Sequence, residues 1–249
     1  MSVRRFLVPP GSLDAESVAI EGELYRHAVK VLRLKAGARV LLADGRGRER
    51  GGIVTEIGRT NLVVTLEEDQ GLTAIPEKGV RIALYQGLPK GEKLDFILQK
   101  GTELGATAIV PFAARRTVVR IPPDQREERL ERWRRIVREA SRQSGRASVP
   151  EVSLAADLDE VLRTAHHPVK LLLWEEERER GLKEMLAQLP EPGSVAVLIG
   201  PEGGFTVEEA KRAQAAGFVP VTLGRRILRT ETAGLALLAI LQFVWGDVG

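Results

Sequence analysis

Residues 200–205, with the sequence GPEGGF, combine features that could hold a ligand. They follow an unbroken apolar run and precede Thr-Val-Glu-Glu, which is a signal for a capped helix. Glycines allow a backbone to approach a bound molecule closely, and the free amides at the start of a helix attract negative groups. A plain strand-to-helix turn needs fewer glycines, so this connection is interpreted as a ligand loop.

A second connection, residues 223–233, reads LGRRILRTETA and again joins a strand pattern to a helix pattern. Its three arginines and one glutamate, taken alone, indicate a solvated charged face. However, the carboxyl ends of parallel strands meet at one edge of a sheet, where ligands bind. The two connections are therefore expected to form a single site.

Other familiar chemistries lack their residues. No G-x-G-x-x-G motif follows a strand pattern and no G-x-S-x-G elbow occurs; residues 87–93, GLPKGEK, resemble a phosphate loop but lack its G-K-[ST] ending. A Rossmann dehydrogenase and a P-loop NTPase are thus disfavoured. Without cysteine and with only three histidines, disulfides and thiolate chemistry are excluded and no metal centre is expected.

The charge balance suits a nucleic-acid partner. The 249 residues include 37 basic and 34 acidic side chains. Arginine dominates the basic residues, and its planar fork reads phosphates and stacks on bases. The same arginine and glutamate content fits a heat-adapted protein with many surface ion pairs, and both readings stay open. No apolar run is long enough to span a membrane and the N-terminus is a poor signal peptide, so a cytoplasmic protein is expected.

Two domains follow from the patterning. About the first 70 residues indicate a small barrel with one helix, at residues 23–34, and strands at residues 4–8, 40–43, 48–57 and 62–66. From residue 79, strands and helices alternate, which is typical of an α/β fold with a parallel sheet. The expected strands are 80–85, 108–112, 169–174, 194–199 and 219–223; the expected helices are 92–104, 125–144, 182–189, one from 206, and 232–245. Residues 76–79, PEKG, have linker character, and the domains are assigned to residues 1–72 and 73–249.

The two connections also carry a resemblance. GPEGGFTVEE at 200–209 and LGRRILRTETA at 223–233 resemble the ribosomal RNA small subunit methyltransferase E family, which belongs to the SPOUT class of knotted methyltransferases. QKGTELGA at 99–106 and EASRQSGR at 139–146 match the family in order and spacing. RRFLV at 4–8 and HAVKVLRLKAG at 27–37 match its N-terminal barrel. The similarity covers essentially the whole chain.

The resemblance implies a fold, an activity and partners. The implied fold is a PUA-like β-barrel that binds RNA, followed by a SPOUT α/β domain with a deep trefoil knot. The implied activity is transfer of a methyl group from S-adenosylmethionine to N3 of a uridine in 16S ribosomal RNA of the small subunit, with S-adenosylhomocysteine as product. A homodimer with the site near the subunit interface is also implied, without metal or membrane.

The same resemblance assigns the cofactor to backbone from neighbouring loops, with residues 171–174 as a third wall. For Trp174 in that wall, simple core packing is the favoured interpretation. The expected cofactor-binding residues are Leu173, Ile199, Gly200, Pro201, Glu202, Gly203, Gly204, Leu223, Gly224, Ile227, Leu228, Thr230 and Thr232.

Catalysis would depend mainly on positioning, because a sulfonium already activates its methyl group. The proton on uridine N3 must leave; Arg229 would stabilise the resulting negative oxygens, and Glu231 or Glu202 would accept the proton. Glu231 would alternatively be a carboxylate that stabilises a helix N-terminus. RNA phosphate contacts are expected from basic residues of both domains. The candidates are Arg4, Arg5, Arg33 and Lys35 on the barrel, and Arg115, Arg116, Arg142 and Arg146 on the catalytic domain. Any single one of these residues is more often an ordinary surface residue than an essential contact.

Three alternatives remain at this stage. The chain could be an RNA-binding ribosome-assembly factor without catalysis, although both loops appear intact in sequence. It could be a SPOUT enzyme acting on transfer RNA or on a ribose oxygen. A small-molecule nucleotide enzyme is the most remote alternative.

Overall fold

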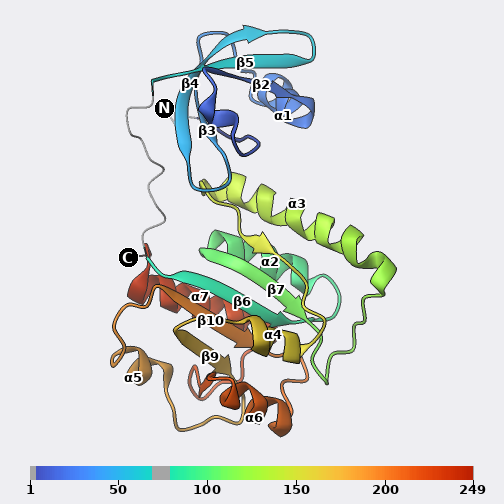
Figure 1. Cartoon of the computed structure of the whole chain (residues 1–249), viewed down its shortest axis with the longest axis vertical. Coiled ribbons are helices and arrows are strands. Elements are labelled where there is room, and N and C mark those ends of the chain that lie inside the picture. Colours follow the sequence, from blue (N-terminus) through green and yellow to red (C-terminus); the bar gives the residue numbers. More distant parts are fainter. Residues whose placement is uncertain (1–3, 69–78, 249) are drawn as a thin grey trace. The chain divides into compact units, whose positions relative to one another are not determined.

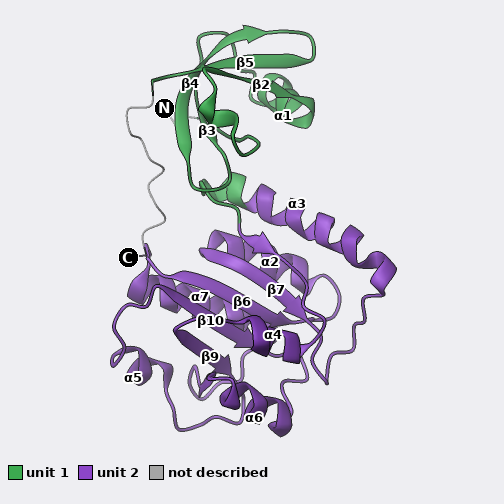
Figure 2. Cartoon of the chain, viewed as in Figure 1, with its two compact units in different colours: residues 1–77, 141–149 green, residues 78–140, 150–249 purple. Residues whose placement is uncertain are grey.

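The computed structural model describes residues 4–68 and 79–248 (Figure 1). The chain divides into two compact units, coloured separately in Figure 2. Unit 1 comprises residues 1–77 and 141–149, and unit 2 comprises residues 78–140 and 150–249. The sequence analysis had placed 141–149 in the second domain, whereas these residues pack within unit 1. Of the predicted linker, residues 76–78 lie outside the described residues.

Unit 1 is built on a curled five-stranded sheet in the order β1-β3-β4-β5-β2. Only β1 and β3 run parallel; the other neighbours are antiparallel. Alternate side chains of the strands, such as Phe6, Leu42 and Val64, are almost completely buried in one core. The strands are β1 (Arg4–Leu7), β2 (Ser17–Glu21), β3 (Arg39–Ala43), β4 (Glu49–Ile57) and β5 (Asn61–Leu66).

The predicted helix at 23–34 is shorter and less regular than expected. It begins as α1 (Gly22–Arg26) and continues as a π-helical turn, η2 (His27–Val31). The amide of Leu32 donates to the carbonyl of His27 at 2.9 Å, and Arg33 adopts a left-handed φ of 53° that ends the helix. Leu32 and Leu34 then pack against the barrel core instead of continuing the helix.

Unit 2 contains a six-stranded, fully parallel sheet in the order β11-β9-β10-β6-β7-β8. The central strand β10 is buried at every residue, as its unbroken apolar run predicted. The parallel sheet expected from the alternating pattern is confirmed. Its strands are β6 (Arg81–Gly87), β7 (Ala106–Phe112), β8 (Glu151–Val152), β9 (Val169–Leu173), β10 (Ser194–Ile199) and β11 (Val219–Val221).

Helices cover both faces of this sheet (Figure 1). On one face, α2 and α7 pack together and against β6, β7 and β10. On the other, buried residues of α4 and α6 share a core with Tyr85, Leu172 and Leu198. The helices are α2 (Lys93–Glu103), α3 (Arg126–Ser144), α4 (Leu158–Thr164), α5 (Leu182–Leu186), α6 (Val207–Ala215) and α7 (Thr230–Trp245), and short 3₁₀ turns are η1 (Ser12–Asp14) and η3 (Pro123–Gln125). None of the helices in residues 4–68 and 79–248 combines the length and apolarity that crossing a membrane requires.

Two strands and one helix, β2, β8 and α4, were not predicted from the sequence. β2 carries only two buried apolar side chains, Val18 and Ile20, between charged flanks. β8 has two residues, and α4 has seven. Each is too short for hydrophobic periodicity to distinguish it from a loop, and it forms because larger neighbours already provide a surface for its few apolar side chains.

Candidate active site

A cavity of about 960 Å³ lies at the carboxyl ends of β9, β10 and β11. Its walls are the connections that follow these three strands, as expected for a ligand site in an open parallel sheet. The structure brings together there all predicted cofactor-binding residues except Thr232, namely Leu173, Ile199, Gly200, Pro201, Glu202, Gly203, Gly204, Leu223, Gly224, Ile227, Leu228 and Thr230. Thr232 lies in the first turn of α7, where its amide donates to the carbonyl of Arg229 at 2.9 Å.

The glycine loop is a tight turn whose last glycine has a left-handed backbone conformation that favours glycine. The amide of Gly204 donates to the carbonyl of Pro201 at 2.9 Å, and Gly204 has a φ of 66°. A Cβ atom at Gly204 would overlap the carboxylate of Glu175. Thr206 and Glu209 then form the predicted capping box of α6, and this prediction is confirmed.

The end of β6 presses directly on this loop. A Cβ atom at Gly87 would lie 2.5 Å from the backbone nitrogen of Pro201 and 2.8 Å from the carbonyl carbon of Gly200. Backbone atoms cannot yield as a flexible side chain can. Gly87 therefore fixes how far the loop can approach the sheet.

A buried hydrogen-bond network joins the glycine loop to the start of α7. The hydroxyl of Thr230 donates to the carbonyl of Gly200 at 2.6 Å, while Nε2 of Gln86 donates to the hydroxyl oxygen of Thr230 at 2.8 Å. Gln86 is completely buried and Thr230 nearly so. Because buried polar groups are costly to leave unpaired, this network holds the two predicted loops in one fixed arrangement.

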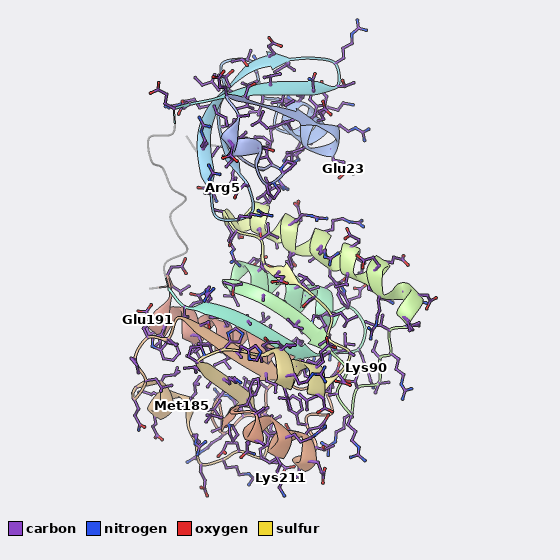
Figure 3. All side chains as sticks on the ribbon, viewed as in Figure 1. Arg5, Glu23, Lys90, Met185, Glu191 and Lys211 are labelled. Atoms are coloured by element: carbon purple, nitrogen blue, oxygen red, sulfur yellow. The ribbon has the colours of Figure 1, made fainter. Side chains whose placement is uncertain are left out.

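Lys93, the first residue of α2, links two predicted catalytic carboxylates. Its Nζ donates to Oε1 of Glu202 at 2.9 Å and lies 3.6 Å from Oε2 of Glu231. The amide of Lys90, labelled in Figure 3, also donates to Oε1 of Glu202 at 3.0 Å. Burial alone would raise the pKa of Glu202, but the hydrogen bonds from Lys93 and Lys90 lower it overall. The bond to Glu202 is likewise the main reason that the pKa of Lys93 is raised.

The other two predicted catalytic residues lie at the start of α7. Arg229 lines the cavity as an exposed residue and occupies the N-cap position of the helix, without a capping hydrogen bond from its side chain. Glu231 does not line the cavity; it reaches the site through Lys93. Its Oε2 atom is buried without a hydrogen-bond partner among the described residues. The carboxylate also lies in the first turn of α7, so the stabilising helix position considered from the sequence is real.

The Lys93 contacts make a prediction about stability and pH. Lys93→Met should destabilise the protein most between the ordinary pKa values of 4.5 for Glu202 and 10.5 for Lys93. A lowered carboxylate pKa stabilises the fold above its unfolded value, and this contribution is lost as pH falls through the folded value. A raised lysine pKa stabilises below its unfolded value, and this contribution is lost as pH rises through the folded value.

Urea unfolding of the wild-type and Lys93→Met proteins across pH would measure this difference. Lys90→Met is the matched control, because Lys90 reaches Glu202 through its backbone amide. A Lys93→Met effect that stayed constant from acid to alkaline pH would show that these ion pairs contribute nothing.

Trp174 lies between the cavity and the core. It lines the cavity, and it also packs against the core on the α4 and α6 face. Its indole Nε1 is buried without a hydrogen-bond partner in the described part of the chain. A buried donor without a partner costs free energy.

The predicted RNA-binding residues are distributed differently from the expectation. Arg142 and Arg146 belong to unit 1, not to the catalytic domain, because the chain from 141 to 149 bonds to the barrel: Nη1 of Arg142 lies 3.1 Å from Nε2 of His27. Arg5 is paired with Glu49 at 2.8 Å. The exposed members of the predicted set are Arg4, Arg33, Lys35, Arg115 and Arg116.

Comparisons with known proteins fit this geometry. Residues 76–242 match the family model described as an RNA methyltransferase domain, and residues 20–67 match an RNA methyltransferase PUA domain. Ribosomal RNA small subunit methyltransferase E of Bacillus subtilis is 33% identical over 236 residues, covering 92% of this chain and 91% of that relative. The chain belongs to the ribosomal RNA small subunit methyltransferase E family. The Synechocystis member is 34% identical, with 94% and 76% covered.

Solved structures of related proteins share this fold. The Neisseria gonorrhoeae ribosomal RNA small subunit methyltransferase E, bound to S-adenosyl methionine, has 34% identity and a TM-score of 0.85, with both chains fully covered. A Legionella pneumophila methyltransferase, in complex with the bound cofactor SAM, has 29% identity and a TM-score of 0.84, covering 99% of this chain and 100% of that one. The expected PUA-like and SPOUT-like α/β domains are thereby confirmed.

Within this family member, sequence reasoning missed two residues that organise the site. Lys93 and Gln86 lie near the carboxyl end of β6, whose following residues 87–93 were set aside because they fail the phosphate-loop pattern. The signal was nevertheless present. A glycine- and lysine-bearing connection follows a buried strand at the same sheet edge as the other two loops.

Proposed function

We propose that this chain transfers a methyl group from S-adenosylmethionine to N3 of a uridine in 16S ribosomal RNA of the small subunit. Family membership and the S-adenosylmethionine in solved relatives support this assignment. One observation carries the assignment: two separate segments, residues 200–204 and 223–230, line one cavity. The hydrogen bond from Thr230 to the carbonyl of Gly200 joins these segments.

The cavity fits S-adenosylmethionine in size and chemistry. Its volume of about 960 Å³ is at the upper end of ordinary small-molecule sites. Residues 200–204 and 223–228 offer amides and carbonyls, and Leu173 and Ile199 offer apolar surface. When bound, the cofactor supplies a methyl group that its sulfonium makes electrophilic.

The residues around the cavity would manage the proton on uridine N3. Arg229, exposed at the rim, is placed to stabilise negative charge on the uracil oxygens. Of the two carboxylate candidates, Glu202 lines the cavity but is a weak proton acceptor, because it already accepts two hydrogen bonds and its pKa is lowered, whereas Glu231 reaches the site only through Lys93. Lys93 would keep both carboxylates in place beside the cavity.

We infer that the chain acts as a homodimer through the exposed face of α7. Ile240, Phe243 and Val244 are 37%, 70% and 44% exposed and lie on one face of that helix. Phe243→Glu should therefore yield a monomer in light scattering, while Val207→Glu on α6, an exposed valine elsewhere, should leave the mass unchanged. A wild-type protein that is already monomeric would contradict this inference.

Two further proposals concern the rest of the fold. Unit 1, which contains the PUA match, would contribute affinity for RNA through exposed residues such as Arg4 and Lys35. The deep trefoil knot implied by the resemblance would involve the chain around residues 223–229, next to the glycine loop. An experimental structure in which this segment does not pass through a loop of the chain would contradict the knot. The cavity would be unaffected, because its lining residues do not depend on the knot.

The function is tested by binding and transfer together. S-adenosylmethionine at 100 times its Kd should stabilise the native state by about 2.7 kcal/mol and so raise the melting temperature. Labelled methyl groups should then pass to 16S ribosomal RNA from a strain lacking the enzyme. Binding without transfer would favour a ribosome-assembly factor, and transfer only to transfer RNA would favour the other SPOUT specificity.

A further inference from the structure

A second cavity of about 460 Å³ lies entirely within unit 2. It is enclosed by the segment that follows β7, the start of α3 and the residues before α4. Its floor is apolar, from Leu88, Ala114 and Ala155, which are all buried. Nothing in the proposed methyl-transfer chemistry uses this space.

The rim of the second cavity is cationic. Arg115, Arg120 and Arg126 line it, and all three are exposed. Within the described part of the chain, Arg120 and Arg126 form no salt bridge. The one acidic lining residue, Asp157, is already engaged, because its Oδ1 accepts the amide of Glu160 as the cap of α4. The cavity therefore presents two available guanidinium groups above an apolar surface.

The wall of this cavity is fixed rather than loose. The amide of Ala114 donates to Oγ1 of Thr117 at 2.8 Å, and the amide of Thr117 donates back to the carbonyl of Ala114 at 3.0 Å. On the opposite side, the amide of Ala155 donates to the carbonyl of Pro111 at 3.1 Å. One wall is thus a hydrogen-bonded turn that directly follows β7, and the other is bonded to β7 itself.

The same wall also borders the cofactor cavity. Arg115 lines the second cavity, while the next residue, Arg116, donates from Nη1 to the carbonyl of Gly203 at 2.8 Å. Gly203 lines the first cavity. One short segment therefore separates the two cavities at the carboxyl edge of one sheet.

We propose that the second cavity holds a nucleotide of the substrate RNA that flanks the methylated uridine. Arg120 and Arg126 would bind its phosphate, and its base would lie on the apolar floor and stack against a guanidinium plane. A ligand with one anionic end and one flat apolar end matches this combination. This inference rests on the proposed function, since it places the uridine itself at the first cavity.

The test compares charge removal with cavity filling. The Arg120→Ala/Arg126→Ala variant should bind a fluorescein-labelled, uridine-rich single-stranded RNA roughly tenfold more weakly, and the slope of log affinity against log salt should fall by about 0.7, the value for one lost phosphate contact. Ala156→Phe, which fills the cavity from an exposed lining position, should weaken binding without changing that slope. Arg129→Ala, an exposed arginine on α3 outside the cavity, is the matched control.

The outcomes separate this inference from the proposed function. If the wild type methylates 16S ribosomal RNA and the double variant binds RNA with unchanged affinity and slope, the second cavity is not an RNA site, although the enzyme assignment stands. If the wild type transfers no methyl group but the double variant still loses affinity and slope, the cavity binds RNA and the assigned reaction is wrong. An effect equal to that of Arg129→Ala would also overturn the proposal.

Discussion

Arg229→Ala is expected to lower kcat for methyl transfer by about 100- to 1,000-fold, the usual cost of losing one donor to a developing anion. Uridine N3 loses its proton in the reaction, so negative charge develops on the uracil oxygens. Arg229 lies at the cavity rim and is exposed, so its removal should not disturb the fold. The affinity for S-adenosylmethionine should therefore stay close to that of the wild type.

Arg229→Lys separates charge from geometry. If the planar fork of arginine matters, lysine should restore only part of the lost rate. The rates are measured with 16S ribosomal RNA at saturating cofactor, and cofactor affinity by calorimetry. Full activity of Arg229→Ala would remove Arg229 from the mechanism, and equal losses of cofactor binding and activity would assign it to binding instead.

Gly87→Ala is expected to weaken S-adenosylmethionine binding by at least about tenfold, because overpacking of this kind commonly costs about 1–3 kcal/mol. The new methyl group would meet the backbone of Gly200 and Pro201, which must then move. That movement would also strain the bond from Thr230 to the Gly200 carbonyl. The effect should appear in cofactor affinity before it appears in overall stability.

Gly193→Ala is the matched control, since nothing lies within 4 Å of the Cβ that it would add. Calorimetric titration of both variants with S-adenosylmethionine gives the comparison. Unchanged affinity in Gly87→Ala would mean that the glycine loop is not where the cofactor binds.

The sequence predicted those parts of the fold that have local causes. The buried run of β10 and the capping box of α6 have local causes, and both appear where expected. The end of the helix near residue 31 was missed because it depends on how Leu32 and Leu34 pack in the barrel. Residues 141–149 were likewise assigned by their position in the chain, whereas their hydrogen bonds join them to unit 1.

The two loops of the site could be predicted from the sequence, but the hydrogen bonds and ion pairs that join them could not. Glycine, arginine and glutamate in residues 200–204 and 223–231 pointed to the cavity, because the carboxyl edge of a parallel sheet brings such connections together. Gln86 and Lys93 act through partners more than 100 residues away, Thr230 and Glu202, and no local pattern encodes such pairings. The second cavity was hidden for the same reason, because its walls come from three separate segments.

Nucleoside mass spectrometry of 16S ribosomal RNA tests most directly whether the paired loops hold a methyl donor over a uridine base. The RNA is taken from a strain lacking the enzyme and is incubated with S-adenosylmethionine and either wild-type or Gly87→Ala protein. The account predicts that N3-methyluridine appears with the wild type and is strongly reduced with the variant. A ribose-methylated product, or no new methylated uridine at all, would contradict it.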